Sequence, residues 1–193
     1  MNPDDRRLIA ACQAGRTDEF GELVRRYQDR LYHSVLRMLD SPDDAADVVQ
    51  DSFINAYQSL NSFKGDSEFF TWLFRIAFNA AISFRRKKRA TVSLDGNRAG
   101  EPIPHPADES SGSQPDERLQ KFEDEVILQR ALNRLSEDHR SAIVLKDIEG
   151  MKYEEMAEVL GIAVGTVRSR LNRARLELRQ LLMENESLRD VTE

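Results

Sequence analysis

At 193 residues the chain has room for one domain or two small ones, and its 40% hydrophobic content is enough for compact cores. No stretch approaches the roughly 18 uninterrupted apolar residues of a membrane span, and the acidic N-terminus lacks the apolar segment of a signal peptide. The single cysteine, Cys12, excludes an internal disulfide, and three scattered histidines lack ligand spacing. We therefore expect a reduced, cytoplasmic protein with no metal site, no other cofactor and no insertion into a membrane.

The net charge of −6 is distributed unevenly along the chain. Residues 91–118 and 181–193 carry net charges of −4 and −3, whereas residues 1–90 and 150–180 carry +1 and +2. The acidity therefore belongs to a middle stretch and to the tail. Two local basic patches remain, and both are compatible with nucleic-acid binding.

The first two predicted helices cover residues 5–14 and about 17–39. Gly15 ends the first helix, and Thr17 or Asp18 caps the second, in which apolar residues recur every three or four positions. This periodicity predicts that one face of the second helix is buried.

A third helix is predicted over about 42–60. Ser41 supplies a capping hydroxyl, Pro42 stands at the first helical position, and the two aspartates that follow suit the positive end of the helix. A loop over 61–67 leads into a fourth helix that ends near Arg89. No alternating strand pattern interrupts this helical module.

Residues 91–118 are rich in proline, glycine and serine and contain almost no large apolar residue. Such a stretch buries too little surface to offset its ordering entropy, so it predicts a flexible, acidic linker. The linker separates two small domains, 1–90 and 119–193. In the second domain the sequence predicts four helices, over about 120–135, 137–148, 152–160 and 164–184. The expected fold class is therefore all-α.

Half of the chain's 14 aromatic residues lie between Phe63 and Phe84, and five consecutive cations follow at 85–89. Flat rings stack on unpaired bases and cations neutralise phosphates, so the run is typical of a surface that binds single strands. The same residues fit a core helix followed by a solvated basic end. The segment alone does not separate these interpretations.

Three aspartates, Asp44, Asp47 and Asp51, share one face of the predicted helix over 42–60. Like charges four residues apart repel, which indicates a basic partner opposite this face. Complementarity to the positive helix end accounts for Asp44 but less well for Asp51, which lies in the third turn. On spacing alone both interpretations stay open.

Residues 153–168 have the pattern of a helix-turn-helix. Ala157 is small where two helices cross, Gly161 permits a left-handed turn, and Ile162 and Val167 fill the angle between the helices. The pattern predicts that the helix after the turn is a recognition helix, whose place is the major groove of DNA.

This second helix carries five arginines and a single acid, Glu177, over residues 164–179. Arginine reads guanine edges in the major groove, and neighbouring cations hold phosphates. The alternative is an amphipathic helix with an arginine-rich solvent face. The register of the motif favours DNA binding.

Taken together, three segments resemble bacterial extracytoplasmic-function (group IV) sigma factors, the initiation subunits of RNA polymerase. They are DVVQDSFINAY at 47–57, FKGDSEFFTWLFRIAFN at 63–79 and VGTVRSRL at 164–171. The resemblance covers roughly residues 5–182, in the family's order and with a linker where the family has one. It implies a domain like sigma region 2 over 1–90 and one like sigma region 4 over 119–193.

The resemblance also implies roles for individual residues. The helix over 42–60 resembles the segment that docks on the clamp helices of the polymerase β′ subunit, with candidate contacts Asp47, Gln50, Asp51 and Phe53. The loop and helix after it resemble the elements that read and open the −10 region, with candidates Phe63, Lys64, Gly65, Asp66, Ser67, Trp72, Arg75, Asn79 and Arg86. The second domain resembles the reader of duplex −35 DNA, with candidates Lys146, Arg168, Ser169, Arg170, Asn172, Arg173 and Arg175.

On the helix over 70–88 the residues divide by face. A polar-aromatic stripe is expected at Trp72, Arg75, Asn79, Ser83 and Arg86, and a packing face at Phe70, Leu73, Phe74, Ala77, Ala80, Ala81 and Phe84. Most of the rings are therefore expected in the core. The basic run at 85–89 becomes a phosphate clamp near the promoter.

The function implied is that of a non-enzymatic sigma subunit, which binds core polymerase, directs it to promoters and helps to open the DNA. Its expected partners are core RNA polymerase, through the β′ clamp helices and the β flap, promoter DNA and an anti-sigma factor. A stand-alone helix-turn-helix regulator is the alternative, but it would have no use for a polymerase-docking helix. An enzyme is disfavoured, because the sequence has no glycine-rich phosphate loop, nucleophile–base pair or metal cluster.

Overall fold

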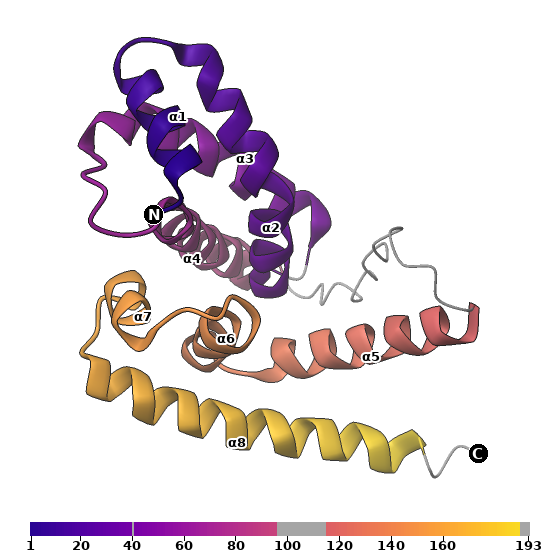
Figure 1. Cartoon of the computed structure of the whole chain (residues 1–193). Coiled ribbons are helices and arrows are strands. Elements are labelled where there is room, and N and C mark those ends of the chain that lie inside the picture. Colours follow the sequence, from indigo (N-terminus) through magenta and orange to yellow (C-terminus); the bar gives the residue numbers. More distant parts are fainter. Residues whose placement is uncertain (40, 96–114, 190–193) are drawn as a thin grey trace.

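The computed structural model describes residues 1–39, 41–95 and 115–189, with side chains for 1–39, 41–88 and 123–184. Within these ranges every regular element is helical, which confirms the all-α class. The helices form two bundles, one above the other in Figure 1. None of the described helices is both long and apolar enough to cross a lipid bilayer.

The first bundle contains four helices and two 3₁₀ turns: α1 (Pro3–Gln13), η1 (Thr17–Glu19), α2 (Phe20–Leu39), α3 (Pro42–Ser59), η2 (Leu60–Ser62) and α4 (Phe69–Asp95). Gly15 ends the first helix as predicted, with a φ of 94° that suits glycine. The hydroxyl of Ser41 caps α3 by accepting from the amide of Asp44 at 3.3 Å, and Pro42 begins the helix.

Helix α1 is fastened to α2 by a buried carboxylate. The Asp5 side chain is inaccessible to solvent, and it accepts from the Tyr27 hydroxyl and the Arg26 guanidinium, each at 2.5 Å. Burial, reinforced by this hydrogen bond to Asp5, raises the pKa of Tyr27. A buried charge needs such partners, so the cluster fixes how α1 lies on the bundle.

The second bundle contains α5 (Pro115–Arg134), α6 (Glu137–Ile143), the π-helical turn η3 (Val144–Ile148), α7 (Tyr153–Leu160) and α8 (Val164–Arg189). Gly161 ends α7 in the left-handed conformation with a φ of 65°, as the helix-turn-helix pattern predicts. One predicted helix, over 137–148, is instead an α-helix that changes to a π-turn at Val144.

The linker predicted over 91–118 is shorter in the structure, because helix extends into both of its ends. Helix α4 continues to Asp95, since neither glycine nor proline interrupts the chain before Gly96. Helix α5 begins at Pro115, whose fixed φ suits the first helical position. The rest of the predicted linker, 96–114, lies outside the described residues.

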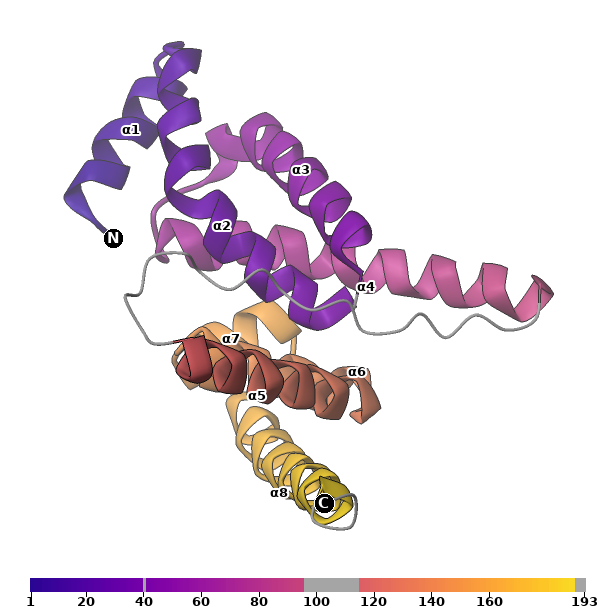
Figure 2. The same cartoon turned by 90° about the vertical axis from the view of Figure 1, so that its right-hand side faces the viewer.

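The two bundles contact each other along one side. Helices α6 and α7 face α2 and α4, while α8 lies on the far side of the second bundle (Figures 1 and 2). The C-terminal part of α4 projects beyond the first bundle (Figure 2). Fully buried apolar side chains occupy both bundles, including Leu8, Leu23, Leu31, Phe69, Leu73 and Phe74 in the first and Leu132, Leu145, Met156 and Leu171 in the second.

Phe74→Ala should lower the free energy of unfolding by about 3–5 kcal/mol, because the Phe74 ring is fully buried and its removal leaves a cavity. Urea denaturation followed by circular dichroism measures this change. Met183→Ala is the control: Met183 is 55% exposed, so its truncation should change stability by less than about 0.5 kcal/mol. Equal losses from both variants would contradict the assignment of the core.

Candidate functional site

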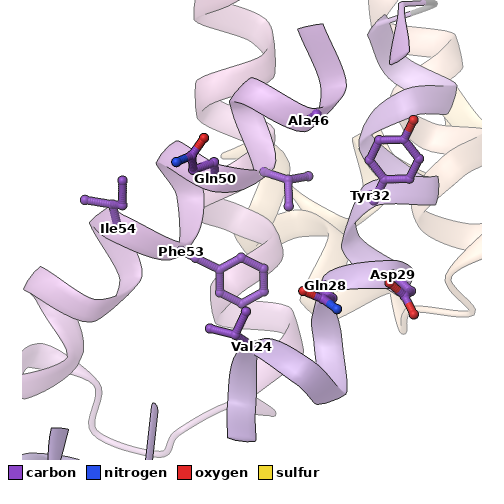
Figure 3. Close-up of a pocket in the computed structure, with 9 residues that line it drawn as sticks. Val24, Gln28, Asp29, Tyr32, Ala46, Gln50, Phe53 and Ile54 are labelled. Carbon is purple, nitrogen blue, oxygen red and sulfur yellow. The ribbon is translucent and has the colours of Figure 1, made fainter. Parts of the chain in front are cut away.

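A groove of about 450 Å³ lies between α2 and α3. Figure 3 shows the Phe53 ring pointing into it from α3 towards Val24 of α2. The lining is an apolar floor with a polar rim, formed by Val24, Gln28, Asp29, Tyr32, Ala46, Val49, Gln50, Phe53 and Ile54. Two of the four predicted polymerase contacts, Gln50 and Phe53, therefore meet in one open groove.

Exposed apolar side chains continue from this groove along α3. Ile54 is 47% exposed and Tyr57 is 43% exposed, whereas large apolar residues elsewhere on the helix are buried. Together with the groove they form a partly apolar surface on this side of α3. Asp47 and Asp51, the other two predicted contacts, are exposed on the same helix but do not line the groove.

The acidic face of α3 has a basic partner inside the chain. Asp44 forms an ion pair with Lys88 of α4, whereas Asp47 and Asp51 face solvent. For Asp44, the basic partner expected from like-charge repulsion is therefore Lys88 of the same chain. Of the three aspartates, Asp47 and Asp51 remain exposed without an ion pair to Lys88.

The loop over 63–67 turns at Gly65, which has a φ of 80°. Lys64, Gly65 and Asp66 are exposed, and Ser67 is half-buried. The start of the loop is held by Gln13 of α1, whose side-chain amide donates to the carbonyl oxygens of Leu60 at 3.0 Å and Phe63 at 3.3 Å. No spacing in the sequence connects Gln13 with this loop, so sequence reasoning missed it.

The two aromatic residues predicted to meet DNA are instead packed against the core. Phe63 and Trp72 are 7% and 8% exposed, and their ring centroids are 5.1 Å apart. Trp72 also contacts Phe69, with centroids 5.8 Å apart. The predicted stripe on α4 is thus corrected at its first member. Packing these rings against each other removes a large apolar area from water, which favours their burial.

The remaining members of the predicted stripe share the solvent-facing side of α4. The side chains of Arg75, Asn79, Ser83 and Arg86 are all exposed. On the opposite side, Phe70, Leu73, Phe74, Ala77 and Ala81 are buried, which confirms the central part of the predicted packing face. Helical spacing therefore places these polar residues on an exposed side of a helix whose other side is in the core.

The basic run after Phe84 is divided between solvent and protein. Arg85 donates to the Met38 carbonyl at 3.1 Å and pairs with Glu137 at 3.4 Å, and Lys88 pairs with Asp44. The Arg85 side chain is therefore engaged by protein groups and only 16% exposed, whereas Lys88 is 55% exposed and pairs with Asp44 at the surface. A phosphate clamp over 85–89 stays a prediction. Arg86 remains exposed, and the Arg89 side chain lies outside the described residues.

In the helix-turn-helix, α8 packs through Val167, Leu171 and Ala174, which are at most 2% exposed. The other side of α8 presents four of the predicted −35 residues to solvent: Arg168, Ser169, Asn172 and Arg173. The structure thus separates a packing side from a reading side on the predicted recognition helix.

Lys146, which lies outside the recognition helix, is brought beside it by Tyr153. The Lys146 ammonium and the Arg168 guanidinium lie 5.2 and 5.5 Å from the centre of the Tyr153 ring. Lys146 also donates to the Met151 carbonyl at 2.8 Å. The structure therefore places Lys146 next to the predicted reading side.

Arg175 and Arg170 are held by carboxylates. Asp147 accepts from Nε and Nη2 of Arg175 at 3.0 and 2.5 Å, and this hydrogen bonding raises the pKa of Arg175. Arg170 pairs with Asp138 at 3.1 Å and is only 20% exposed. Arg175 thus keeps Nη1 for another ligand, whereas Arg170 packs at the edge of the bundle.

Comparison with known proteins assigns both bundles to one class of protein. Residues 23–91 match the sigma-70 region 2 family, and residues 125–178 match the sigma-70 region 4 family. The first match contains α3 and most of α4, and the second contains the helix-turn-helix. The fold and its exposed surfaces are therefore those of a sigma-70-type transcription initiation factor.

Several relatives resemble nearly the whole chain. The ECF RNA polymerase sigma-E factor of Haemophilus influenzae is 38% identical over 176 residues, which cover 89% of this chain and 91% of the relative. Its counterpart in Escherichia coli K12 is 39% identical over 179 residues, with coverages of 89% and 90%. The chain belongs to the extracytoplasmic-function family of RNA polymerase sigma factors. It directs polymerase to promoters and is not a stand-alone regulator.

Solved structures agree with this assignment. Sigma factor RpoE from Bartonella quintana, determined with the anti-sigma factor NepR, matches with a TM-score of 0.70 and 32% identity, over 86% of this chain and 97% of that one. CnrH, determined with the cytosolic domain of CnrY, matches with a TM-score of 0.68 and 32% identity, over 94% and 99%. Both matches extend over the two bundles.

Proposed function

We propose that the groove between α2 and α3 docks on core RNA polymerase. Its apolar floor and the exposed Ile54 and Tyr57 suit a helical partner that lays an apolar side into a groove. The exposed carboxylates of Asp47 and Asp51 suit basic residues beside that partner. Membership of the family supports core RNA polymerase as the partner, and we infer that the groove meets the clamp helices of its β′ subunit, while the β flap is contacted elsewhere on the chain.

We propose that the exposed face of α4 and the loop before it hold the unpaired −10 strand. Arg75, Asn79 and Arg86 combine cations with an amide on one helical face, and Lys64 and Asp66 extend it into the loop. Unstacking costs a few kcal/mol per base, and contacts made only with the separated strand offset this cost. Binding of the open strand would thus favour melting without any catalytic step.

We propose that α8 reads the −35 duplex from the major groove. Arg168, Asn172 and Arg173 are free to meet base edges and phosphates. Asp147 holds one edge of Arg175, which fixes the direction of the remaining donors and lowers the entropy lost on binding. Asp147 would then be a positioning residue for Arg175.

The observation that carries the whole proposal is the presence of two separate exposed faces with cations and amides, on α4 and α8, in two bundles of one chain. A polymerase subunit needs both faces, because the −35 and −10 elements are read in different states of the DNA. We infer a non-enzymatic, cytoplasmic protein that acts on core polymerase and promoter DNA. We also infer an anti-sigma partner, since CnrH and RpoE were each determined with a bound protein.

Run-off transcription with sigma-free core polymerase tests the proposal. On a promoter from the chain's own genome, addition of the full-length chain should give a defined transcript that core polymerase alone does not produce. Binding of the chain to promoter duplex without any transcript would contradict it.

Ile54→Ala should weaken the association with core polymerase by about 1–2 kcal/mol, because Ile54 is an exposed apolar residue at the proposed groove. Fluorescence titration of labelled core measures the affinity, and thermal denaturation checks that the fold is unchanged. Leu176→Ala, which truncates an exposed apolar residue on α8, should leave the affinity as it is. If both variants bind like the parent chain, the groove is not the docking surface.

Asn79→Ala should impair strand opening and leave binding to −35 duplex intact, because Asn79 lies on α4 and not in the second bundle. Opening is measured by 2-aminopurine fluorescence at −10 in the polymerase complex, and duplex binding by anisotropy. Gln58→Ala, an exposed amide on α3, is the matched control. Equal loss of both activities in Asn79→Ala would refute the division of labour between the bundles.

Arg175→Ala should lower the affinity for −35 duplex by ~1–3 kcal/mol and relax the preference at one base pair, if its guanidinium reads a base. Asp147→Ala should relax the same base pair, because it frees Arg175 to rotate. Competition assays with single-base variants of the −35 element measure both effects. Arg134→Ala, a change of the same charge on α5, is the control, and a base preference unaltered by Arg175→Ala would remove this residue from the readers.

A further inference from the structure

The loop over 63–67 begins at a helix end whose carbonyls face α1. The 3₁₀ turn η2 continues α3 and ends at Ser62, directly before the loop. The last carbonyls of a helix lack partners within it and need donors from elsewhere. Inside the turn, the Leu60 carbonyl accepts from the amide of Phe63 at 3.1 Å. Helix α1 packs against η2 and supplies further donors to this helix end.

One side chain of α1 provides two of these donors. The amide nitrogen of Gln13 donates to the carbonyl oxygen of Leu60 at 3.0 Å and to that of Phe63 at 3.3 Å. A primary amide carries two N–H groups, one for each carbonyl. Gln13 is the last residue of α1, so it reaches the loop from the end of the helix. It therefore bridges the turn before the loop and the first residue of the loop.

Helix α1 is a firm support for this contact. Its buried Asp5 carboxylate accepts from Arg26 and Tyr27 of α2, each at 2.5 Å, and Leu8 is 1% exposed in the core. A supporting hydrogen bond restrains its acceptor only when the donor is itself held by packing. The position of Gln13 is thus set by the core of the first bundle.

Phe63 is also held from the side of α4. Its ring is 7% exposed, and the ring centroids of Trp72 and Phe69 lie 5.1 and 5.9 Å away. The ring and the carbonyl of one residue are therefore held by two different helices, α4 and α1. This fixes the direction in which the chain leaves Phe63 and enters the exposed residues 64–66.

The turn of the loop lies beside the other end of α1. A methyl group added at Gly65 would lie 3.4 Å from Cε of Met1, which is partly buried against the core. Both views show the N-terminal end of α1 near the start of α4 (Figures 1 and 2). Helix α1 thus extends along the loop, with Met1 near its turn and Gln13 at its start.

We propose that Gln13 is a positioning residue for this loop. It holds the first residue of the loop, so that residues 64–67 keep one conformation before the open strand arrives. A loop that is ordered in advance loses less conformational entropy on binding. Gln13 then contributes to affinity and base preference without touching DNA. The consequence for DNA rests on the proposed function of the loop, whereas the restraint on the loop does not.

Trp72 is the single tryptophan of the chain and packs on Phe63, so its fluorescence reports on the start of the loop. In Gln13→Glu a carboxylate oxygen replaces the NH₂ group and faces two carbonyl oxygens that have lost their donor. In the free full-length chain this variant should therefore show stronger quenching of Trp72 by acrylamide than the parent, in which Trp72 is 8% exposed. Gln58→Glu, the same change at an exposed position of α3, should leave the quenching as it is.

Circular dichroism separates a loosened loop from a lost fold, because every variant should keep the helix content of the parent. Gln13→Leu removes both donors without adding a charge, and it replaces Gln13→Glu if that variant fails to fold. Unchanged quenching of Trp72 in the folded variant would overturn the positioning role.

Strand binding measures the consequence for DNA. With the chain bound to core polymerase, Gln13→Glu should weaken binding of a labelled single strand carrying its own promoter's −10 sequence by about threefold to tenfold, the loss expected from one or two hydrogen bonds. It should also reduce the preference for the native base at one position, which a general loss of stability would not do. Affinities for core polymerase and −35 duplex should stay unchanged, since Gln13 lies in neither the groove nor the second bundle.

A loop variant separates the two kinds of failure. Lys64→Ala combined with Asp66→Ala keeps the net charge and should weaken strand binding; adding Gln13→Glu to it should cost less than about twofold more, because all three changes act through one loop. If the loop variant binds more weakly but Gln13→Glu alters neither affinity nor preference, the positioning role is overturned. If the loop variant binds like the parent, the proposed function of the loop fails, and Trp72 quenching alone decides whether Gln13 holds the loop.

Discussion

The architecture depends on the burial of the aromatic side of α4. Phe69, Leu73 and Phe74 are fully buried, and α4 packs against both α2 and α3 while its other side is exposed. Each buried ring or leucine contributes about 1.5–3 kcal/mol by leaving water. The rotation of the helix is therefore fixed, and Arg75, Asn79, Ser83 and Arg86 lie on its exposed side. The proposed −10 surface is thus part of a helix whose position is set by the core.

In the second bundle, ion pairs rather than buried rings orient the exposed side chains. Helix α8 presents arginines on its free side, and unpaired they would repel each other and adopt many conformations. Asp147 and Asp138 each hold one of them, and Tyr153 gathers Lys146 and Arg168 over its ring. The result is a basic surface with a defined direction. Helix α8 itself lies on the side of the second bundle away from the first (Figure 1).

Local signals in the sequence predicted most of the helices and their division into two groups. The hydroxyl of Ser41, the glycines at 15 and 161 and the three-to-four periodicity of apolar residues act within a few positions of the chain, where sequence can be interpreted directly. The free face of α4 from Arg75 to Arg86 was likewise predictable, because helical spacing alone decides which residues share a side.

What local signals could not predict were contacts between distant segments. Nothing near Trp72 indicates that Phe63 and α7 cover it, and nothing near Arg85 or Lys88 indicates that these cations are bound to protein. Gln13 was missed for the same reason, since its partners lie 47 and 50 residues away. These contacts decide which of the conspicuous residues are free to bind a partner.

The central claim is that one chain carries two DNA-reading faces that work on a single polymerase. Permanganate footprinting of the chain with core polymerase on its own promoter tests this claim most directly. We expect reactive, unpaired thymines near −10 only when the chain and core polymerase are both present, together with protection of the −35 duplex. Protection at −35 with no reactive thymines near −10 would contradict it.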